Sequence, residues 1–276
     1  MKEITIGHTP DADDAFMFYG LETEKVVSPF FKFKHVIDDI ETLNNYALNG
    51  TLDVTAISAY AYSFIKDYVI LTSGASFGVN YGPAVFSKKE LSLSQLKECS
   101  VAIPGKMTSA NLLLSLVIGK FNSLEMNFQS ILDAVLSDKV DAGLVIHESQ
   151  ITYDKSHLHK VIDLGAWWHN STGGLPVPLG INVANVKSLT FEEIRAFNSL
   201  LRDSIVYGFR NTSSAMNYAM KYSRGNTNRV MKKFIKMYVN DKTVDMGEIG
   251  KKAINELFMM AFHQGLVPFS IEPIFS

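Results

Sequence analysis

The sequence predicts an α/β protein in which strands alternate with helices along the chain. Three observations support this prediction. Short strand-like runs alternate with helical patterns, two separate segments repeat one order of residue types, and an extended glycine- and proline-rich segment follows them. Alternation of this kind is typical of βαβ units, so we expect a largely parallel sheet with helices packed against it.

The first third of the chain provides one set of strands and helices. Strands are expected over residues 4–7, 31–37 and 54–58, and helices over about 13–21 and 41–48. Asn49-Gly50 ends the second helix, because glycine is favoured just past a helix C-terminus. A glycine-rich stretch over residues 73–83 then leads into an extended run over residues 84–86.

A second set of similar parts follows. Helices are expected from Ser94, over 109–118 and over 128–136, and strands over 101–104 and 141–146. Residues 48–54 and 136–142 share one pattern: a helix end, a polar turn, an apolar residue, an aspartate and a small or apolar residue. This internal repeat suggests two similar α/β lobes, although two ordinary helix-to-strand connections within one sheet would give the same pattern.

The last third of the chain is predicted to be mainly helical. An extended, proline-containing segment over residues 173–182 crosses to this part of the chain. Thr190 and Glu193 are spaced as a capping box for a helix to about residue 209. Apolar residues recur at helical spacing over 229–239 and 249–262, with Gly265 ending the last helix. Methionines and aromatic residues in these helices are expected to form core.

Composition excludes several classes of protein. Of 276 residues, 47% are hydrophobic and 20% charged, and the formal net charge is -2, so no basic surface for nucleic acid or membrane is predicted. The chain has neither an apolar signal segment nor the roughly 20 apolar residues needed to span a bilayer, so we expect a cytoplasmic protein. The single cysteine, Cys99, rules out an internal disulfide and a cysteine-based zinc cluster.

His147 is the first candidate for chemistry. It follows the apolar run over residues 141–146, so it is expected at the C-terminal end of a strand. Ligands of open α/β sheets bind at that edge, and imidazole transfers protons readily near neutral pH. His147 is therefore a candidate general base, and a histidine that only caps a loop is the alternative.

The acidic segment at residues 8–19 opens a helix directly after the first strand. The helix dipole and capping of free amides explain Asp11 and Asp13, which leaves Asp14, Tyr19 and an exposed His8 as groups that could line a cleft. Three aspartates within four helical residues cannot converge on one ion. No metal site is therefore predicted.

A possible anion site lies at residues 104–110, where a strand, a glycine turn and a helix N-terminus follow one another. Free amides there, with the hydroxyl groups of Thr108 and Ser109, would hold a carboxylate or phosphate, and plain helix capping is the alternative. Because the first arginine is Arg195, a carboxylate fits this site better than a polyphosphate. Ser58 ends a strand that would face His147 if the chain forms two facing lobes.

Several longer motifs together resemble the 1,4-dihydroxy-6-naphthoate synthase family of the futalosine route to menaquinone. They include His-Thr-Pro-Asp-Ala-Asp-Asp-Ala-Phe-Met-Phe-Tyr at residues 8–19, Asp-Ile-Glu-Thr-Leu-Asn at 39–44 and Gly-Leu-Pro-Val-Pro-Leu-Gly at 174–180. Further matches lie at residues 73–78, 81–83, 102–105, 146–148, 163–165 and 167–168. The resemblance covers residues 8 to about 182, and its motifs are specific only in combination.

The resemblance implies a two-lobed fold like that of type II periplasmic binding proteins, with a ligand cleft between the lobes. We expect lobe 1 over residues 1–87, lobe 2 over 88–182, and a helical segment over 183–276 that packs back mainly on lobe 1. The oligomeric state stays open.

The implied reaction is a carbon-carbon lyase reaction without a cofactor. It converts cyclic dehypoxanthine futalosine, a small aromatic carboxylate, to 1,4-dihydroxy-6-naphthoate and dihydroxyacetone. Through the resemblance His147 matches the proton acceptor, and Glu148 is not expected to orient it because adjacent strand residues point oppositely. Substrate-binding positions are expected at Asp14, Asn44, Ala56, Ile57, Ser58, Thr108, Ser109 and Ala110. Chorismate dehydratase on the same scaffold and a non-catalytic small-carboxylate-binding protein remain as alternatives.

Overall fold

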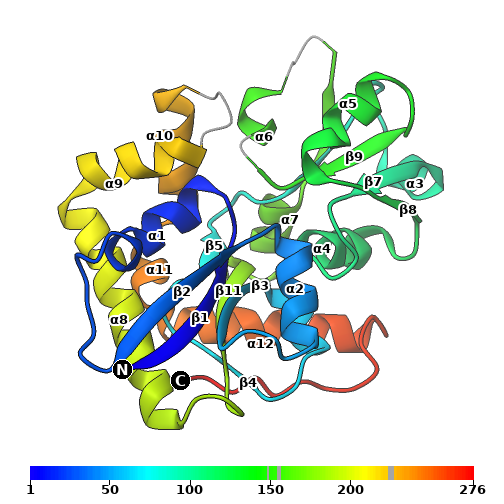
Figure 1. The fold of residues 1–276 in the computed structure, drawn as a ribbon. Helices are drawn as coiled ribbons and strands as arrows, with labels where there is room; N and C mark the ends of the chain where they lie inside the picture. Colours follow the sequence, from blue (N-terminus) through cyan, green and yellow to red (C-terminus); the bar gives the residue numbers. More distant parts are fainter. Residues whose placement is uncertain (148, 154–156, 223–226) are drawn as a thin grey trace.

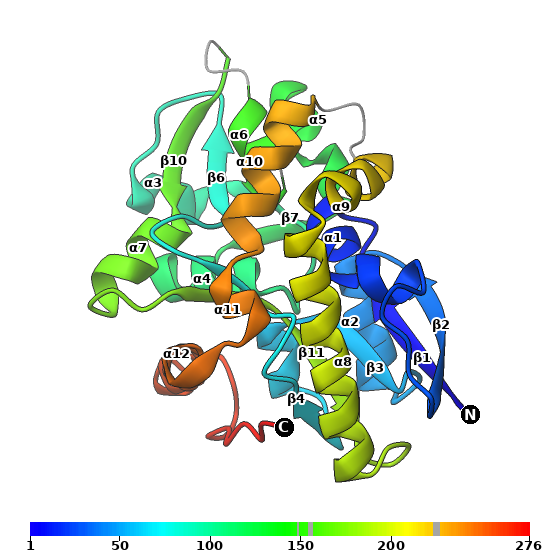
Figure 2. The same ribbon diagram turned by 90° about the vertical axis from the view of Figure 1, so that its left-hand side faces the viewer.

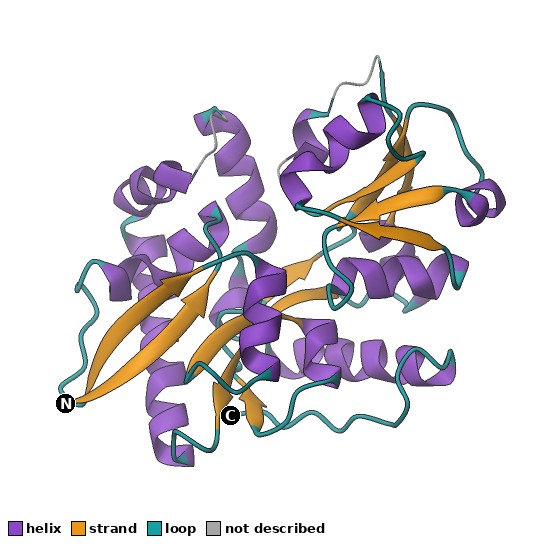
Figure 3. Cartoon of the chain, turned by 45° about the vertical axis from the view of Figure 1, so that its right-hand side comes forward, coloured by secondary structure: helices purple, strands orange, loops and turns teal. Residues whose placement is uncertain are grey.

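Two separate β-sheets organise the computed structural model of the chain, which describes residues 1–147, 149–153, 157–222 and 227–276 (Figure 1). The first sheet contains β1 (Lys2–His8), β2 (Phe31–Ile37), β3 (Val54–Ser58), β4 (Tyr68–Ile70), β5 (Ser76–Gly78) and β11 (Val177–Asn185). The second contains β6 (Ala84–Ser87), β7 (Ser100–Ile103), β8 (Asn122–Glu125), β9 (Ala142–Val145) and β10 (His159–Asp163). Figure 3 shows the two groups of strands apart from each other, one at the lower left and one at the upper right, which confirms the two-lobed prediction.

Both sheets are mixed, and the prediction of a largely parallel sheet is therefore wrong in part. The strand order is β2-β1-β3-β11-β4 in the first sheet and β10-β6-β9-β7-β8 in the second. Parallel pairs join β1 to β2 and β3, and β7 to β8 and β9. The strands β6 and β11 instead pair antiparallel with their neighbours. Both follow segments that cross from one lobe to the other, and the crossing reverses the strand direction.

The strand pairing divides the chain earlier than the expected boundaries at residues 87 and 182. Strand β6 pairs with β9 and β10, so it belongs to the second sheet although it lies before residue 88. Strand β11 begins at Val177 and pairs with β3 in the first sheet. Sheet membership depends on contacts between residues distant in sequence, which local composition does not reveal.

The segment that leads from β5 to β6 contacts the start of α7 through a pair of glycines. The Gly82 amide donates to Asp163 Oδ1 over 3.1 Å. A side chain on Gly165 would lie 2.0 Å from the carbonyl atoms of Tyr81, so only glycine allows this contact between backbones. The connection from β5 to β6 is thereby held against the end of β10 and the start of α7.

Helices surround both sheets. Around the first lobe lie α1 (Ala12–Glu22), α2 (Ile40–Leu48), α8 (Phe191–Arg210), α9 (Thr212–Ala219), α10 (Asn228–Tyr238), α11 (Asp241–Val244) and α12 (Gly247–His263), with the 3₁₀ turns η1 (Ala59–Ser63) and η3 (Met220–Tyr222). Around the second lie α3 (Leu93–Glu98), α4 (Ser109–Ile118), α5 (Ile131–Leu136), α6 (Ser149–Thr152) and α7 (Leu164–Ser171), with the 3₁₀ turn η2 (Phe128–Ser130).

The C-terminal helices cover the first lobe and also reach the second. Helices α8, α9 and α10 pack against α1, and Figure 2 shows α8 running along the length of the first sheet. Ser204 on α8 donates to the carbonyl of Met17 over 2.7 Å, which fixes α8 against the buried helix α1. Helix α12 contacts both β11 and α4, and α10 contacts α6, so these two helices touch elements of both lobes.

One hydrophobic core runs from the first lobe into the second. It includes Ile57 and Phe77 of the first sheet together with Val85 and Leu113 of the second lobe, all fully buried. Trp168 is fully buried in the same core, and its indole N–H donates to the carbonyl of Pro176 over 3.1 Å. Within the part of the chain that the structure describes, no helix is long and apolar enough to cross a membrane.

Candidate functional site

A cavity lies between the two lobes, as expected for this fold class. Its empty space is about 760 Å³ including the part open to solvent, and it is formed by the β1–α1 loop, the ends of β3 and β9, the start of α4, β11 and α10. The residues that line it are Thr9, Asp11, Asp13, Asp14, Ile40, Ala56, Ser58, Gly74, Ser76, Pro83, Thr108, Ser109, Ala110, Ile146, His147, Leu179, Gly180, Ile181, Asn182, Phe234 and Tyr238.

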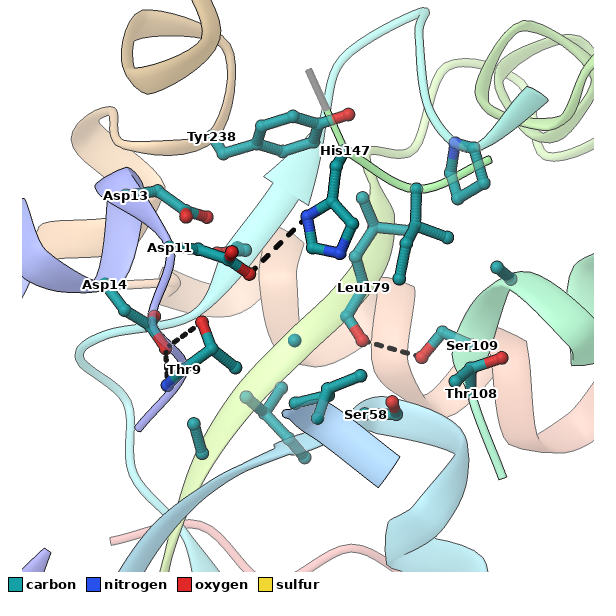
Figure 4. A pocket seen from close by; sticks show the side chains of 18 of the residues that line it. Thr9, Asp11, Asp13, Asp14, Ser58, Thr108, Ser109, His147, Leu179 and Tyr238 are labelled. Carbon is teal, nitrogen blue, oxygen red and sulfur yellow. Dashed lines mark hydrogen bonds and ion pairs between the residues drawn. The ribbon is translucent and has the colours of Figure 1, made fainter. Parts of the chain in front are cut away.

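His147 projects into this cavity from the segment that follows β9 (Figure 4). Its Nδ1 lies 3.5 Å from Asp11 Oδ2, and its ring packs on Phe128 with 3.9 Å between ring centroids. The side chain is buried. A carboxylate beside one ring nitrogen favours the proton there, which leaves the other nitrogen as the base.

The side chain of Asp11 does not cap α1, contrary to the interpretation from sequence. Asp11 occupies the N-cap position, but it makes no side-chain capping hydrogen bond. Asp14 instead reaches back and accepts hydrogen bonds from the amide and the hydroxyl of Thr9, over 2.6 and 2.8 Å. The carboxylate of Asp11 is therefore directed to His147.

Asp13 and Asp14 are carboxyl groups with raised pKa values. Burial, followed by the charges of Asp14 and Asp11, raises the pKa of Asp13 well above its usual value. Burial also raises the pKa of Asp14, although the charge of His8 and the hydrogen bonds from Thr9 oppose this shift. A carboxyl group that keeps its proton can donate a hydrogen bond into the cavity.

The raised pKa of Asp13 predicts that Asp13→Asn stabilises the protein at neutral pH. The folded state holds the Asp13 proton more tightly than the unfolded chain, so its contribution to stability is complete below the unfolded pKa of about 3.9. That contribution is lost as the pH rises toward the raised folded pKa. The uncharged amide of the variant avoids this loss.

Urea unfolding of wild type and Asp13→Asn at about pH 4 and about pH 8 measures the effect. We expect a higher midpoint for the variant at the higher pH and a smaller difference at the lower pH. Equal differences at both pH values would contradict the raised pKa.

The start of α4 forms the wall opposite the aspartates (Figure 4). Thr108 caps the helix by accepting from the Asn111 amide, and Ser109 Oγ donates to the carbonyl of Leu179 over 2.6 Å. The Ser109 hydroxyl also accepts from the Tyr60 amide over 3.3 Å. It therefore joins the second lobe to β11 and η1 of the first.

The predicted anion site at this helix start is smaller than expected. The Lys106 amide donates to Glu125 and the Met107 amide donates to Glu41, each over 3.2 Å, so the protein's own carboxylates occupy the glycine turn. The amides of Ser109 and Ala110 donate to no described residue, and both residues line the cavity. These two groups are the remaining donors of the first helical turn.

Strand β3 contributes two lining residues and one residue that faces away. Ala56 and Ser58 line the cavity, whereas Ile57 between them is fully buried in the core, as alternation along a strand requires. Asn44 is fully buried behind Ser58. It accepts from the Ser58 amide over 2.8 Å and donates to Glu41 over 2.9 Å, so it positions Ser58 from behind.

Several lining residues were not predicted from the sequence, and His8, like Asn44 and Ile57, lies outside the cavity lining. Tyr238 reaches the cavity from α10, where its hydroxyl accepts from Gln150 over 2.9 Å, and no local pattern connects it with residues so far away in sequence. His8 was expected to be exposed, but it is 1% exposed and its ring stacks on Phe18. Glu148, the other residue considered beside His147, lies outside the described residues.

The architecture and the interlobe cavity define a protein of the periplasmic-binding-protein fold. The alkanesulfonate-binding protein SsuA from Xanthomonas axonopodis pv. citri superposes with a TM-score of 0.72 at 15% identity, over 98% of this chain and 96% of that one. At this identity the similarity concerns the fold alone. A crystal structure of a protein from Archaeoglobus fulgidus is more similar, with a TM-score of 0.91 and 46% identity over 96% and 98% of the two chains.

The chain belongs to the menaquinone biosynthesis family, whose model matches residues 4–263. Within it the chain is 38% identical to the 1,4-dihydroxy-6-naphthoate synthase of Thermus thermophilus, over the whole of both proteins. It is 32% identical to the synthase of the same name from Streptomyces coelicolor, over 96% of this chain and 95% of that protein. These comparisons confirm the resemblance found in the sequence motifs.

Proposed function

We propose that this protein is a carbon-carbon lyase that converts cyclic dehypoxanthine futalosine to 1,4-dihydroxy-6-naphthoate and dihydroxyacetone. The observation that carries the proposal is the placement of His147 over the interlobe cavity with Asp11 beside its Nδ1. Two relatives named 1,4-dihydroxy-6-naphthoate synthase, 38% and 32% identical to this chain, support the proposal. The scheme uses only side chains and amides of the protein and needs no cofactor.

His147 is the proposed general base. The carboxylate of Asp11 holds a proton on Nδ1, and Nε2 then accepts the proton whose removal begins the reaction. The separation of 3.5 Å is long for a hydrogen bond, and such contacts often shorten when substrate binds. Breaking the carbon-carbon bond makes the new ring aromatic, so the substrate itself provides the driving force.

The chemistry of the two walls supports one orientation of the substrate. The β1–α1 wall carries three aspartates, whereas the α4 wall offers the free amides of Ser109 and Ala110. The Asp11 carboxylate of the first wall repels a substrate carboxylate, whereas the second wall attracts it, because the helix N-terminus there favours negative charge. The hydroxyl groups of the part released as dihydroxyacetone then face the aspartates, which accept hydrogen bonds from hydroxyls.

Asp13 is the proposed hydrogen-bond donor to the oxygen on which negative charge develops. Burial and its neighbouring carboxylates raise its pKa, so it holds a proton where an ordinary aspartate has lost it. A neutral carboxyl group in a buried site can stabilise a developing oxyanion by donation. This role explains why a destabilising cluster of three acidic groups lies next to the base.

Substitution of Ser109 by proline tests the carboxylate site directly. Proline is tolerated at the first position of a helix, and Thr108 before it already has the extended conformation (φ -73°, ψ 143°) that proline requires. The change removes the Ser109 amide hydrogen, whose bond to a charged carboxylate is worth about 10- to 100-fold in affinity. We expect the dissociation constant of 1,4-dihydroxy-6-naphthoate, measured by fluorescence titration, to rise by that factor.

Ser109→Ala is the matched control, because it removes the same hydroxyl group but keeps the amide. The alanine variant loses the contacts to Leu179 and Tyr60 and is expected to bind the product more tightly than the proline variant. Equal affinities for the two variants would show that the Ser109 amide does not hold the carboxylate.

Parallel incubations distinguish the proposed activity from its alternatives. Purified protein is given cyclic dehypoxanthine futalosine in one reaction and chorismate in another, and products are separated by chromatography. We expect the first reaction to yield 1,4-dihydroxy-6-naphthoate. We expect the chorismate in the second reaction to remain unchanged. Dehydration of chorismate would instead indicate the chorismate dehydratase, and tight binding of either compound without turnover would indicate a binding protein.

A further inference from the structure

Three side chains of types that commonly bind metals, two histidines and a glutamate, converge on one face of the β1–β2 pair. Ile6 is paired with His35, and side chains alternate along a strand, so His8 and His35 share the face that α1 covers. Glu22 is the last residue of α1, and its Oε1 lies 3.1 Å from His8 Nε2. None of the three residues lines the interlobe cavity.

The distances between the ligand atoms fit a single metal ion. His8 Nε2 lies 3.1 Å from Glu22 Oε1 and 3.1 Å from His35 Nδ1, and all three atoms lie within 4.8 Å of one another. Four ligands at about 2.0–2.1 Å from zinc in a tetrahedron lie about 3.3 Å apart. The two short separations are close to this value.

The hydrogen bonding is incomplete without a cation among the three groups. A neutral His8 has one N–H to share between the Glu22 carboxylate and the His35 nitrogen, which both face its Nε2. Glu22 Oε1 is buried, and among the described residues its close polar neighbour is His8 Nε2, at an ion-pair distance of 3.1 Å. A buried oxygen in this state is costly unless a positive charge compensates it.

Outer contacts orient two of the ligands in the way that metal sites require. His8 Nδ1 lies 3.4 Å from the carbonyl of Thr9, so a proton on Nδ1 leaves Nε2 free to bind a metal. Glu22 Oε2 accepts a hydrogen bond from the Tyr218 hydroxyl, which leaves Oε1 directed at the histidines. Ligating histidines and carboxylates commonly carry such second partners.

We propose that His8, Glu22 and His35 bind a divalent transition metal ion, with Zn²⁺ as the ion that best fits this ligand set. Two imidazoles and one carboxylate are a known combination for zinc with an open fourth position. The half-buried His35 leaves that position accessible to water. The ion would join β1, β2 and α1 directly behind Thr9, which holds Asp14 at the edge of the cavity.

Cobalt titration tests this site without depending on turnover. The full-length chain, free of any affinity tag and treated with a chelator, is titrated with Co²⁺, whose visible absorption reports four-coordinate binding. We expect one equivalent to bind, Zn²⁺ to displace it, and Zn²⁺ to raise the melting temperature of the wild type. His35→Ala is expected to weaken Co²⁺ binding about 100-fold or more, since loss of an outer contact alone costs about 10- to 100-fold.

Two further variants keep the test decisive. Glu22→Gln preserves the size of the side chain and should also weaken binding, so a folding defect in one variant does not determine the result. His159→Ala removes an exposed histidine of β10 and should bind Co²⁺ like the wild type. The proposal would be overturned if the wild type did not bind Co²⁺, or if His35→Ala and Glu22→Gln both bound it as tightly as the wild type. Loss of binding in His159→Ala would also overturn it.

Discussion

Replacing His147 by alanine is expected to lower kcat by about 10²- to 10⁴-fold, the usual contribution of a general base. The imidazole lies at the cavity wall beside Asp11, and the described lining residues offer no second histidine to replace it. The measurement is the steady-state rate of naphthoate formation from cyclic dehypoxanthine futalosine. Binding of the product should change little, because the proposed carboxylate site lies on α4.

The control for this experiment is the same substitution at His159, an exposed residue of β10 outside the cavity. Its rate should match that of the wild type. A His147→Ala variant that is folded and retains the wild-type rate would leave the lyase activity in place but exclude His147 as the base.

Asp11→Asn is expected to have the second largest effect. The amide keeps the size of the carboxylate but no longer favours a proton on His147 Nδ1, so the imidazole loses its tautomer and part of its orientation. We expect kcat to fall by about 10²- to 10⁴-fold, in line with the loss of an aspartate behind a catalytic histidine. KM should stay nearly unchanged, since Asp11 acts through His147.

The rates of Asp11→Asn are compared with those of Asp133→Asn, which alters an exposed aspartate of α5 that does not line the cavity. Full activity in both variants, or a change confined to KM in Asp11→Asn, would show that Asp11 contacts the substrate or the protein without supporting the base.

Local sequence patterns were sufficient to predict most helices and the position of His147. The capping box of Thr190 and Glu193 predicted the helix observed as α8, and both of its reciprocal hydrogen bonds are present. His147 was predicted at the end of a strand facing a cleft, and it follows β9 and lines the cavity. These predictions succeeded because each depends on neighbours within a few residues.

Features that depend on distant residues were not predictable in the same way. Strand β8 is exposed throughout and shows no alternation, and β4 has only three residues. Asp11 had an adequate local explanation as a helix N-terminal acid, which concealed its contact with a histidine 136 residues away. Tyr238 reaches the cavity only because α10 packs beside the β1–α1 segment.

The role of Asn44 shows where a motif and a contact differ. The motif around residues 39–44 predicted that Asn44 binds substrate, whereas the side chain is fully buried and holds Ser58. Ser58 in turn lines the cavity. A position can therefore belong to a family motif because it positions a neighbouring group, and sequence alone does not separate the two roles.

The proposed lyase reaction is tested by the product balance of wild-type protein incubated with cyclic dehypoxanthine futalosine alone. We expect 1,4-dihydroxy-6-naphthoate and dihydroxyacetone to form in equal amounts, with no added cofactor. Failure of folded protein to turn over this compound, or formation of naphthoate without an equal amount of dihydroxyacetone, would contradict it.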